Sequence, residues 1–440
     1  MSFDCIVVGS GPGGYVAAIR ASQLGMRTAV VERAAIGGRC LNHACIPAKA
    51  VLRSAEVLSE VRHAQDFGIR LNGAALDVDF GAISERRKHI ISTLTGGVSG
   101  LFKKNDIAVL RGQAVLTPDA DVKIGETVHK ANRAVVLATG SVRRPLPNLD
   151  YGGNVIGTEE AWALDELPKS MVVIGAGASG AEIASAYARL GTRVTLYEAL
   201  ERVLPTEDPD ISKIALQLFK KQGIDVKTST FYEGHKADWT VIAAGRRPDV
   251  NGLGLGDAGI ELTDGGLIMV DGAMQTTHPK VYAIGDLVPG PALAHKASDE
   301  GIIAVEDAAG RETHPISYAD IPRATFCSPN VASFGLTEEQ AREAGHDVVV
   351  GRVPYGAVGA GTIYGDRTGL VKIVGDRKFG ELLGAHIVGS RATELIQELV
   401  NVRLLEGGYT EVARIIHGHP TLSEAVMEAA RAADGWLIHG

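Results

Sequence analysis

Two of the four cysteines in this 440-residue chain, Cys40 and Cys45, lie five positions apart in the stretch GGRCLNHACIPAKAVL at 37–52. The other two, Cys5 and Cys327, stand alone, and we expect both to be structural because a buried free cysteine packs like a small apolar side chain. Four cysteines are too few for a disulfide scaffold. A close pair in such a chain is more often catalytic than structural, so this pair predicts thiol–disulfide chemistry.

Residues 46–62 carry apolar side chains at helical spacing, and Pro47 suits a first helical turn, which places Cys45 at about the N-cap. The helix dipole and the free N–H groups there would stabilise a thiolate and lower its pKa. In a regular helix, Cα atoms five positions apart are about 8–9 Å apart, whereas a disulfide needs less than about 7 Å. The segment between the cysteines must therefore be irregular if they bond, and two sulfurs in such unequal places suit a disulfide that opens and closes.

Two alternatives for the pair stay open at this point, a metal site and two unrelated structural thiols. His43 lies between the cysteines, but a zinc site usually needs a second such pair or a Cys/His quartet, and the sequence has no second cluster. We therefore predict no bound metal. His43 itself is expected either to lower a thiol pKa and shift the reduction potential or to be a solvated bystander.

An internal repeat indicates the elements that must position this chemistry. DCIVVGSGPGGYVAAIRASQLGMRTAVVE at 4–32 aligns with SMVVIGAGASGAEIASAYARLGTRVTLYE at 170–198, with a constant offset of 166. Each copy predicts an apolar strand, a Gly-x-Gly-x-x-Gly turn, an alanine-rich helix and a second strand that ends in glutamate. The aligned positions are Gly9 with Gly175, Gly11 with Gly177, Gly14 with Gly180, and Glu32 with Glu198.

The order of these features in each copy is typical of dinucleotide binding. The first glycine makes the tight turn, the second lets a pyrophosphate approach the backbone, and the third lets helix and strand pack closely. The helix N-terminus offers N–H groups to phosphate, and the glutamate accepts hydrogen bonds from a ribose. A simple βα turn is the alternative for either copy alone, but the full pattern occurs twice. Glu198 would repel the 2′-phosphate of NADP, which favours NAD in the second copy.

Composition excludes some classes of function. A net charge of −8 and a pI near 5.9 argue against nucleic-acid binding. No apolar run is long enough to span a membrane, and a predicted strand begins almost at the N-terminus, where a signal peptide would need a basic and then an apolar segment. We expect a cytoplasmic protein with no membrane partner.

Six motifs together resemble the pyridine nucleotide-disulfide oxidoreductase family over nearly the whole chain. They are GSGPGG, GGRCLNHACIPAKA, GAGASGAE, AAGRRPD, AIGDLVPGPALAHKASDEG and HGHPTLSEAV. The residues of LAHKASDEG and HPTLSEA are similar to the corresponding motifs of the family members that oxidise dihydrolipoamide. The resemblance implies FAD in the first repeat, NAD in the second, and transfer of electrons from dihydrolipoamide to NAD.

The resemblance also implies site residues. For FAD these match the family's contacts to the flavin and its ADP half: Gly9, Gly11, Gly14, Glu32, Lys49, Gly112, Thr139, Gly140, Asp286, Leu293, Ala294 and His295. Among them, Asp286 matches the family's aspartate at the ribityl chain of the flavin (the flavin chain). For NAD they are Gly175, Gly177, Gly180, Glu182, Glu198 and Gly245. Lys49 and Glu182 match an ion pair of the family at the flavin, and the alternative for both is a solvated helix charge.

In the family's mechanism, Cys40 would exchange with the substrate sulfur and Cys45 would be the charge-transfer thiol against the flavin. His419 would be the acid–base catalyst, because an imidazole titrates near neutral pH and can take a thiol proton, and Glu424 would orient its ring. The family pattern implies that His419 reaches the cysteines of the other subunit of a homodimer. His417 is expected to be structural.

The predicted fold is α/β, with two Rossmann-like dinucleotide-binding domains and a C-terminal α+β dimerisation domain. The expected boundaries are 1–145 for the FAD-binding domain, 146–265 for the NAD-binding domain, 266–317 for a central domain completing the FAD site, and 318–440 for the interface domain. Only about ten residues, FYEGHKADWT, separate IDVKTST from VIAAGRRPD, where relatives carry a longer excursion. We therefore predict a shortened NAD-binding domain with an intact nucleotide fold.

The implied partners are dihydrolipoamide or a lipoyl domain, a second copy of the chain, and a 2-oxo-acid dehydrogenase or glycine cleavage complex. Three alternative functions are weighed against the sequence. A mercuric reductase would end in paired cysteines, but the chain ends in GWLIHG. A glutathione-type reductase would prefer NADP and would be expected to carry arginines after the last strand of the second repeat. A non-catalytic flavoprotein subunit would not need Cys40, Cys45, His419 and Glu424 together.

Overall fold

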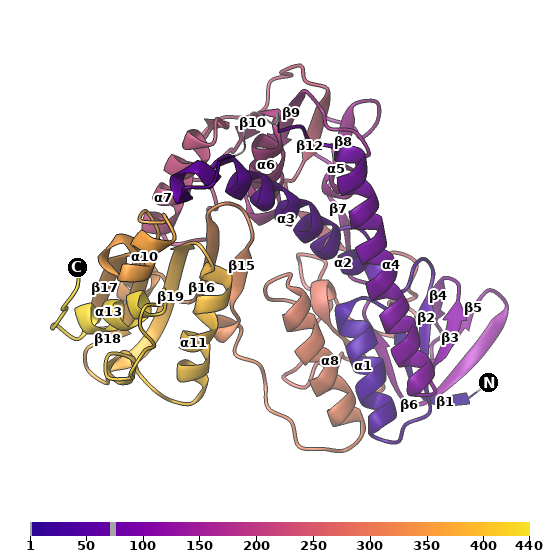
Figure 1. Ribbon diagram of the computed structural model, residues 1–440. Helices are drawn as coiled ribbons and strands as arrows, with labels where there is room; N and C mark the ends of the chain where they lie inside the picture. Colours follow the sequence, from indigo (N-terminus) through magenta and orange to yellow (C-terminus); the bar gives the residue numbers. More distant parts are fainter. Residues whose placement is uncertain (1, 71–75) are drawn as a thin grey trace. The chain divides into compact units, whose positions relative to one another are not determined.

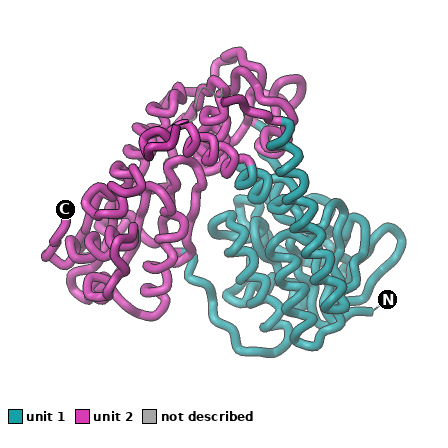
Figure 2. Tube along the Cα trace, viewed as in Figure 1, with its two compact units in different colours: residues 1–50, 81–145, 245–318 teal, residues 51–80, 146–244, 319–440 magenta. Residues whose placement is uncertain are grey.

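The computed structural model describes residues 2–70 and 76–440, and it forms two compact units (Figure 2). Unit 1 comprises residues 1–50, 81–145 and 245–318. Unit 2 comprises residues 51–80, 146–244 and 319–440. The chain leaves and re-enters each unit, so segments far apart in the sequence build one core.

The main sheet of unit 1 contains the first repeat. Its strands, in spatial order, are β3 (Ala108–Arg111), β2 (Thr28–Glu32), β1 (Ser2–Val8), β6 (Thr127–Leu137), β5 (Val122–Ile124) and β4 (Ala114–Leu116), and β14 (Val281–Ala283) pairs with β6. Pairing is parallel from β3 to β6 and to β14, and antiparallel among β6, β5 and β4. Cys5, Ile6 and Val7 are fully buried, because a central parallel strand is covered on both faces.

The helices of unit 1 surround this sheet. They are α1 (Pro12–Gln23), α2 (Gly38–Asn42), the start of α3 (Cys45–Arg62), most of α4 (Phe80–Lys104) and α8 (Ala294–Ala308). α1 and α8 lie side by side (Figure 1) because glycines let their backbones touch. A Cβ on Gly13 would lie 2.7 Å from the Ala297 carbonyl oxygen, and one on Gly301 would lie 2.8 Å from that of Gly13. A two-stranded antiparallel ribbon, β7 (Ser141–Arg143) with β13 (Arg246–Pro248), completes the unit.

The second repeat forms a five-stranded parallel sheet in unit 2. Its strands, in spatial order, are β11 (Asp225–Lys227), β10 (Arg193–Tyr197), β9 (Ser170–Ile174), β12 (Trp239–Ile242) and β8 (Val155–Gly157). Its helices are α5 (Thr158–Ala163), α6 (Ala178–Leu190) and α7 (Pro209–Lys221). Residues 228–238 join β11 to β12 without a helix or strand. The strands and the helix of the repeat are thus complete although the connection is short.

The C-terminal part of unit 2 is an antiparallel sheet with helices. Its strands, in spatial order, are β15 (Arg323–Thr325), β16 (Asn330–Gly335), β19 (Glu381–Gly389), β18 (Leu370–Asp376) and β17 (Val348–Pro354). Its helices are α9 (Glu338–Glu343), α10 (Gly359–Ile363), α11 (Ala392–Leu404), α12 (Tyr409–Val412) and α13 (Glu424–Ala433). Phe334, Tyr355, Ile373 and Ile387 lie fully buried in its core. The predicted fold class, two Rossmann-like domains plus an α+β domain, is confirmed.

A buried ion network joins the two sheets of unit 2. Asp208 caps α7 by accepting a hydrogen bond from the Asp210 N–H at 3.0 Å. The ammonium of Lys372 on β18 donates to both carboxylate oxygens of Asp208 at 2.9 Å and to Asp210 at 2.8 Å. Burial works to lower the pKa of Lys372, but these carboxylates outweigh it and raise that pKa above its usual value. The lysine therefore stays charged and compensates a fully buried aspartate.

Replacing Lys372 with methionine should destabilise unit 2 by about 3–5 kcal/mol, because Asp208 would remain as a buried charge without its partner. Arg352 offers a control, since its half-exposed side chain contacts the same cluster through Asp210. The change Arg352→Met should cost less than about 1 kcal/mol, as for an exposed ion pair. Denaturant unfolding of both variants measures the difference, and equal losses would contradict the assignment.

Candidate functional site

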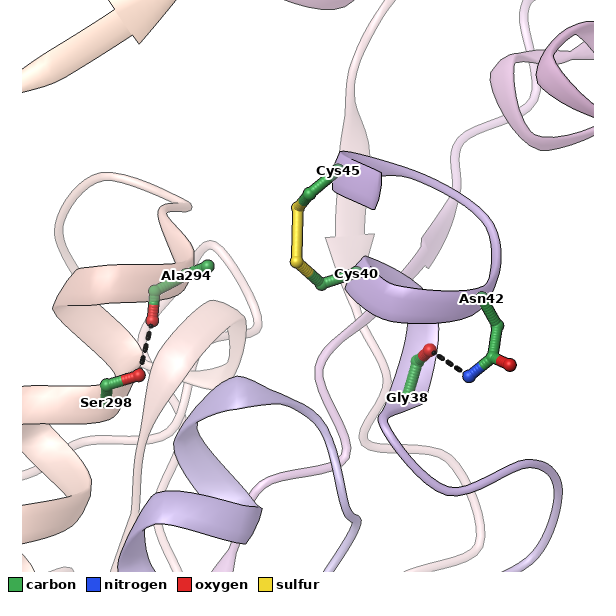
Figure 3. The surroundings of a disulfide bond; sticks show 6 residues. All are labelled: Gly38, Cys40, Asn42, Cys45, Ala294 and Ser298. Carbon is green, nitrogen blue, oxygen red and sulfur yellow. Dashed lines mark hydrogen bonds between the residues drawn. A yellow bond between two sulfur atoms is a disulfide. The ribbon is translucent and has the colours of Figure 1, made fainter. Parts of the chain in front are cut away.

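Cys40 and Cys45 form a disulfide, with their Cα atoms 4.7 Å apart (Figure 3). Cys40 lies on α2, which ends at Asn42, and Cys45 is the first residue of α3, so the helix is interrupted at His43 and Ala44. The segment is irregular, as the separation of the cysteines required. Cys45 begins the helix rather than capping it, a one-residue correction to the prediction. The disulfide side chains are half-buried, whereas His43 is exposed.

The helix that carries Cys40 packs directly on the first glycine turn. A Cβ on Gly38 would lie 2.6 Å from the Cα of Gly11. The Gly37 N–H donates to the Ser10 hydroxyl at 3.2 Å. The side-chain amide of Asn42 donates to the Gly38 carbonyl at 2.8 Å, which closes α2 (Figure 3). The disulfide is therefore held next to the turn at which the repeat predicts the dinucleotide phosphates.

The glycines of the first turn leave space where a pyrophosphate would need it. A Cβ on Gly9 would lie 2.4 Å from the Ala138 carbonyl oxygen, and one on Gly14 would lie 2.0 Å from that of Gly9. A Cβ on Gly11 would meet nothing within 4 Å. α1 starts directly after Gly11 without a side-chain cap, so the N–H groups of its first turn can bind an anion.

Glu32 ends β2 beside this turn and is almost fully buried. Its carboxylate accepts hydrogen bonds from the Ser10 N–H at 3.0 Å, the Ser10 hydroxyl and the Ala34 N–H at 2.8 Å. A carboxylate held by backbone donors keeps a fixed orientation and retains acceptor capacity for a ribose hydroxyl. The first repeat therefore fits the adenosine half of FAD.

The second turn repeats this construction in unit 2. A Cβ on Gly180 would lie 1.8 Å from the Gly175 carbonyl oxygen, whereas one on Gly177 would meet nothing within 4 Å. Glu198 follows β10 and accepts hydrogen bonds from the Ala176 N–H at 2.7 Å and the Leu200 N–H at 2.9 Å. The second repeat therefore fits a second dinucleotide by the same physical criteria.

These contacts separate a structural glycine from a binding glycine. Gly180→Ala should lower the thermal unfolding midpoint, because its Cβ cannot fit against the Gly175 carbonyl. Gly177→Ala should unfold like wild type but lower the affinity for NAD about tenfold or more, because its methyl group enters the space that the pyrophosphate would occupy. Calorimetry and NAD titration measure both properties. Normal NAD affinity in the Gly177 variant would contradict the placement of the pyrophosphate.

Three further FAD candidates lie at the strand ends of unit 1. The Gly112 N–H donates to the Glu32 carbonyl at 3.2 Å. The Thr139 hydroxyl donates to the Asp249 carbonyl at 2.7 Å, and the Asp249 N–H donates to the Gly140 carbonyl at 2.9 Å. Thr139 and Gly140, which follow β6, are thus fixed to Asp249, which follows β13. These contacts bring Gly112, Thr139 and Gly140 to the same edge of the sheet as the first glycine turn.

Asp286 stands in the turn after β14, where the resemblance placed a contact to the flavin chain. Its carboxylate accepts a hydrogen bond from the Ser141 hydroxyl. The Arg246 Nε–H donates to that hydroxyl oxygen at 2.9 Å. Neither Ser141 nor Arg246 was predicted as a site residue. Ser141 ends the stretch LATGS at 137–141 and Arg246 lies within AAGRRPD, but neither motif indicates a contact between residues more than a hundred positions apart.

The other candidates are placed as follows. Leu293 precedes α8, whose first two residues are Ala294 and His295. Lys49 lies on α3 one turn after Cys45 in unit 1, and Glu182 lies on α6 in unit 2, so their ion pair stays a prediction. The buried Glu182 carboxylate accepts a hydrogen bond from the Phe326 N–H at 2.9 Å. Gly245 has a φ of 96° just before β13.

His419 and Glu424 meet in unit 2. The His419 Nδ1 lies 2.9 Å from the Glu424 carboxylate, which also accepts a hydrogen bond from the Thr421 N–H at the start of α13. Burial works to raise the pKa of Glu424, but His419 and Thr421 outweigh it and hold that pKa below its usual value. The carboxylate therefore stays charged and fixes the ring, as a catalytic imidazole requires.

His417, two positions before His419, lies in a different environment. The His417 side chain is only 4% exposed and its Nε2 lies 2.6 Å from Glu398, whereas the His419 side chain is 76% exposed. Burial works to lower the pKa of His417, but Glu398 outweighs it and raises that pKa. The contrast agrees with the expectation that His417 is structural. It leaves His419 available to a group from outside its own chain.

Three other observations concern the remaining thiols, possible metal ligands and long apolar helices. Cys5 and Cys327 are buried free thiols, and burial raises the pKa of Cys5 to about 12. Residues 2–70 and 76–440 contain no cluster of three or more His, Cys, Asp or Glu side chains that could hold a metal ion. Across the same residues, no helix has both the length and the apolar character needed to cross a membrane.

A close disulfide beside one of two dinucleotide-binding folds defines a disulfide oxidoreductase. The family profile of the pyridine nucleotide-disulphide oxidoreductases matches residues 3–301, and the profile of the dimerisation domain of that family matches residues 321–430. The chain belongs to this family, whose members use FAD and NAD.

Individual relatives match over the full length. A dihydrolipoyl dehydrogenase of Bacillus subtilis is 40% identical, with 99% of each chain covered, and one of Mycobacterium bovis is 41% identical with the same coverage. Among solved structures, LpdA of Mycobacterium tuberculosis has a TM-score of 0.89 at 26% identity, covering 97% of this chain and 99% of its own. The HOCl-induced flavoprotein disulfide reductase RclA of Escherichia coli has a TM-score of 0.85 at 26% identity, covering 97% and 99%.

Proposed function

We propose that this enzyme oxidises dihydrolipoamide to lipoamide and reduces NAD to NADH, using the Cys40–Cys45 disulfide as the first electron acceptor. The disulfide at the start of α3, packed against the first glycine turn, is the observation that carries the proposal. Full-length similarity to dihydrolipoyl dehydrogenases supports this substrate over mercuric ion or glutathione. The shared dimerisation domain supports a homodimer.

The thiol chemistry balances as two exchanges. One thiolate of dihydrolipoamide attacks the Cys40 sulfur, forming a mixed disulfide and releasing Cys45 as a thiolate. The second substrate thiol loses its proton and attacks the substrate sulfur of the mixed disulfide, which forms lipoamide and releases Cys40. Two electrons now reside on the two cysteine sulfurs. Bound FAD supplies the route by which such a pair of electrons reaches NAD.

The chain's own residues supply binding and proton transfer. Cys45 begins α3, where the N–H groups of the first turn stabilise its thiolate. His419 accepts the substrate thiol proton at Nε2 while Glu424 holds Nδ1. In a homodimer, His419 of one copy acts on the disulfide of the other, which accounts for its exposure in the single chain. The glycine turns and Glu32 and Glu198 hold the two dinucleotides.

The partners and the location follow from the same chemistry. A lipoyl group is carried by a lipoyl domain of a 2-oxo-acid dehydrogenase or glycine cleavage complex, and we propose such a domain as the physiological substrate. The dihydrolipoyl dehydrogenases that the chain resembles come from bacteria, and we propose that the enzyme works in the cytoplasm. FAD is assigned to residues 1–145 with 266–317, NAD to residues 146–265, and the subunit interface to 318–440.

One assay tests the function. The purified protein is mixed with dihydrolipoamide and either NAD or NADP, and absorbance at the wavelength of reduced nicotinamide is followed. We expect rapid reduction of NAD and little of NADP, since Glu198 would repel a 2′-phosphate. Glutathione disulfide and mercuric ion, offered with reduced nicotinamide, serve as control substrates. Faster turnover of either control than of dihydrolipoamide would refute the proposal.

A further inference from the structure

A charged pair is completely enclosed in unit 1, behind the turn that carries Asp286. Lys296 and Glu300 lie one helical turn apart on α8, with an N–O distance of 3.0 Å and no side-chain exposure for either residue. Lysine and glutamate are almost never fully buried unless they are paired, and here each is the partner of the other. The mechanism above does not use either residue.

Both side chains bind the backbone of a single glycine. The Lys296 ammonium donates to the Gly285 carbonyl at 2.9 Å. The Gly285 N–H donates to the Glu300 carboxylate at 2.7 Å. Gly285 has a φ of 71°, and a Cβ there would lie 3.2 Å from the Ala297 Cβ on α8. The pair therefore fixes this left-handed residue, and with it the direction in which Asp286 leaves the sheet.

Tyr318 closes the pair on its far side. Its hydroxyl donates to the second Glu300 oxygen at 2.6 Å, and the Lys296 ammonium lies 5.2 Å from the centre of its ring. Burial raises the pKa of Glu300, although Lys296, Tyr318 and the Gly285 N–H each work to lower it. A Cβ on Gly290 would lie 2.7 Å from the tyrosine ring, so the ring is held tightly in place.

Asp286 is thus fixed from two sides. Its carboxylate is held by Ser141, and its backbone is held through Gly285 by Lys296 and Glu300. α8 in turn packs against α1, the helix of the first glycine turn, by backbone contact at Gly13 and Gly301. The helix that carries the buried pair therefore contacts both the helix of the first glycine turn and the turn of Asp286.

We propose that Lys296 and Glu300 are positioning residues for FAD, which set the turn that presents Asp286 to the flavin chain; this rests on the proposed placement of FAD. Stability alone does not account for the pair, because apolar residues of similar volume often replace a buried ion pair at no loss of stability. Apolar residues cannot satisfy both the N–H and the carbonyl of Gly285, and an unsatisfied buried backbone group would let the turn change its conformation.

Two double variants test this role. Lys296→Met with Glu300→Leu removes both bonds to Gly285 and leaves no buried charge. Lys296→Met with Glu300→Gln also removes the charges but keeps an acceptor for the Gly285 N–H. FAD is removed from each protein and titrated back by flavin fluorescence, and the reduction potential and visible spectrum of the bound flavin are recorded. Lys372→Met, which breaks a buried pair in unit 2, is the matched control.

We expect the leucine variant to weaken FAD binding about tenfold or more, because the loss of even one of its two buried hydrogen bonds to Gly285 corresponds to about tenfold, and to shift the flavin spectrum and potential. The glutamine variant should recover most of the affinity, and Lys372→Met should bind FAD like wild type despite its lower stability. If the leucine variant binds FAD within about twofold of wild type with an unchanged potential, the pair is only structural and the proposal is overturned.

Measurements on the wild-type protein distinguish a failure of the positioning role from a failure of the proposed function. A wild type that contains FAD and oxidises dihydrolipoamide supports the function whatever the variants do, so unchanged variants would then overturn the positioning role alone. A wild type that binds no flavin would overturn both. If the leucine variant does not fold, Lys296→Met with Glu300→Met takes its place, because it removes the same two bonds to Gly285 with unbranched side chains, and FAD affinity within about twofold of wild type in that variant would likewise overturn the proposal.

Discussion

Replacing Cys40 with serine is expected to slow NAD reduction by dihydrolipoamide at least about a thousandfold, because no disulfide remains to accept the substrate's electrons. Cys40 and Cys45 are the only pair of cysteines bonded in the part of the chain that the structure describes. A serine hydroxyl cannot exchange with a thiolate, and the remaining Cys45 thiol cannot take two electrons alone. The rate is measured as NADH formed under saturating substrate.

The same variant has a reaction that it should retain. Oxidation of NADH by a small dye needs the two dinucleotide sites but no disulfide, so Cys40→Ser should perform it at a rate comparable to wild type. Cys5→Ala is the matched cysteine control, since Cys5 is fully buried in β1 and should affect stability alone. Full lipoamide activity in Cys40→Ser would remove the disulfide from the mechanism, and loss of the dye reaction would indicate misfolding instead.

Alkylation gives an independent measure of the same pair. Wild-type protein treated with a thiol reagent under native conditions should gain no label, because Cys5 and Cys327 are buried and Cys40 and Cys45 are bonded. After reduction by dihydrolipoamide, the label should appear on Cys40 and Cys45, and mass spectrometry identifies the labelled peptides.

The features that the sequence predicted correctly are those with local causes. Gly14 and Gly180 are required by contacts within a single strand–turn–helix unit, so their spacing alone indicates the fold. The irregular segment between Cys40 and Cys45 followed from the length of a disulfide compared with the rise of a helix. Family resemblance added the roles of residues such as Asp286, which no local pattern distinguishes from an ordinary turn.

The features that the sequence did not predict depend on distant partners. Lys372 meets Asp208 across more than 160 positions, and Ser141 meets both Asp286 and Arg246 across more than a hundred. Lys296 and Glu300 are visible in the sequence as an i, i+4 pair, which is normally a solvated helix contact. Only the packing of α8 against α1 and against the turn Gly285–Leu287 shows that they are buried.

Replacing His419 with glutamine is expected to slow dihydrolipoamide oxidation by about 10²–10⁴, the usual contribution of a general base. Glutamine can still donate a hydrogen bond to Glu424 but cannot accept a proton. His417→Gln is the control, because His417 also binds a glutamate but is buried. It should lower thermal stability and leave turnover nearly unchanged, whereas a threefold or smaller loss in His419→Gln would exclude His419 as the base.

Mixed dimers test whether His419 acts on the disulfide of the other copy. Co-expressing Cys40→Ser and His419→Gln chains with different affinity tags allows the heterodimer to be isolated. If His419 acts in trans, one site combines both lesions and the other combines an intact disulfide with an intact histidine. The heterodimer should then regain about half of wild-type turnover although each parent is inactive, as two-fold symmetry requires. If His419 acts within its own chain, both sites carry one lesion and the heterodimer stays inactive.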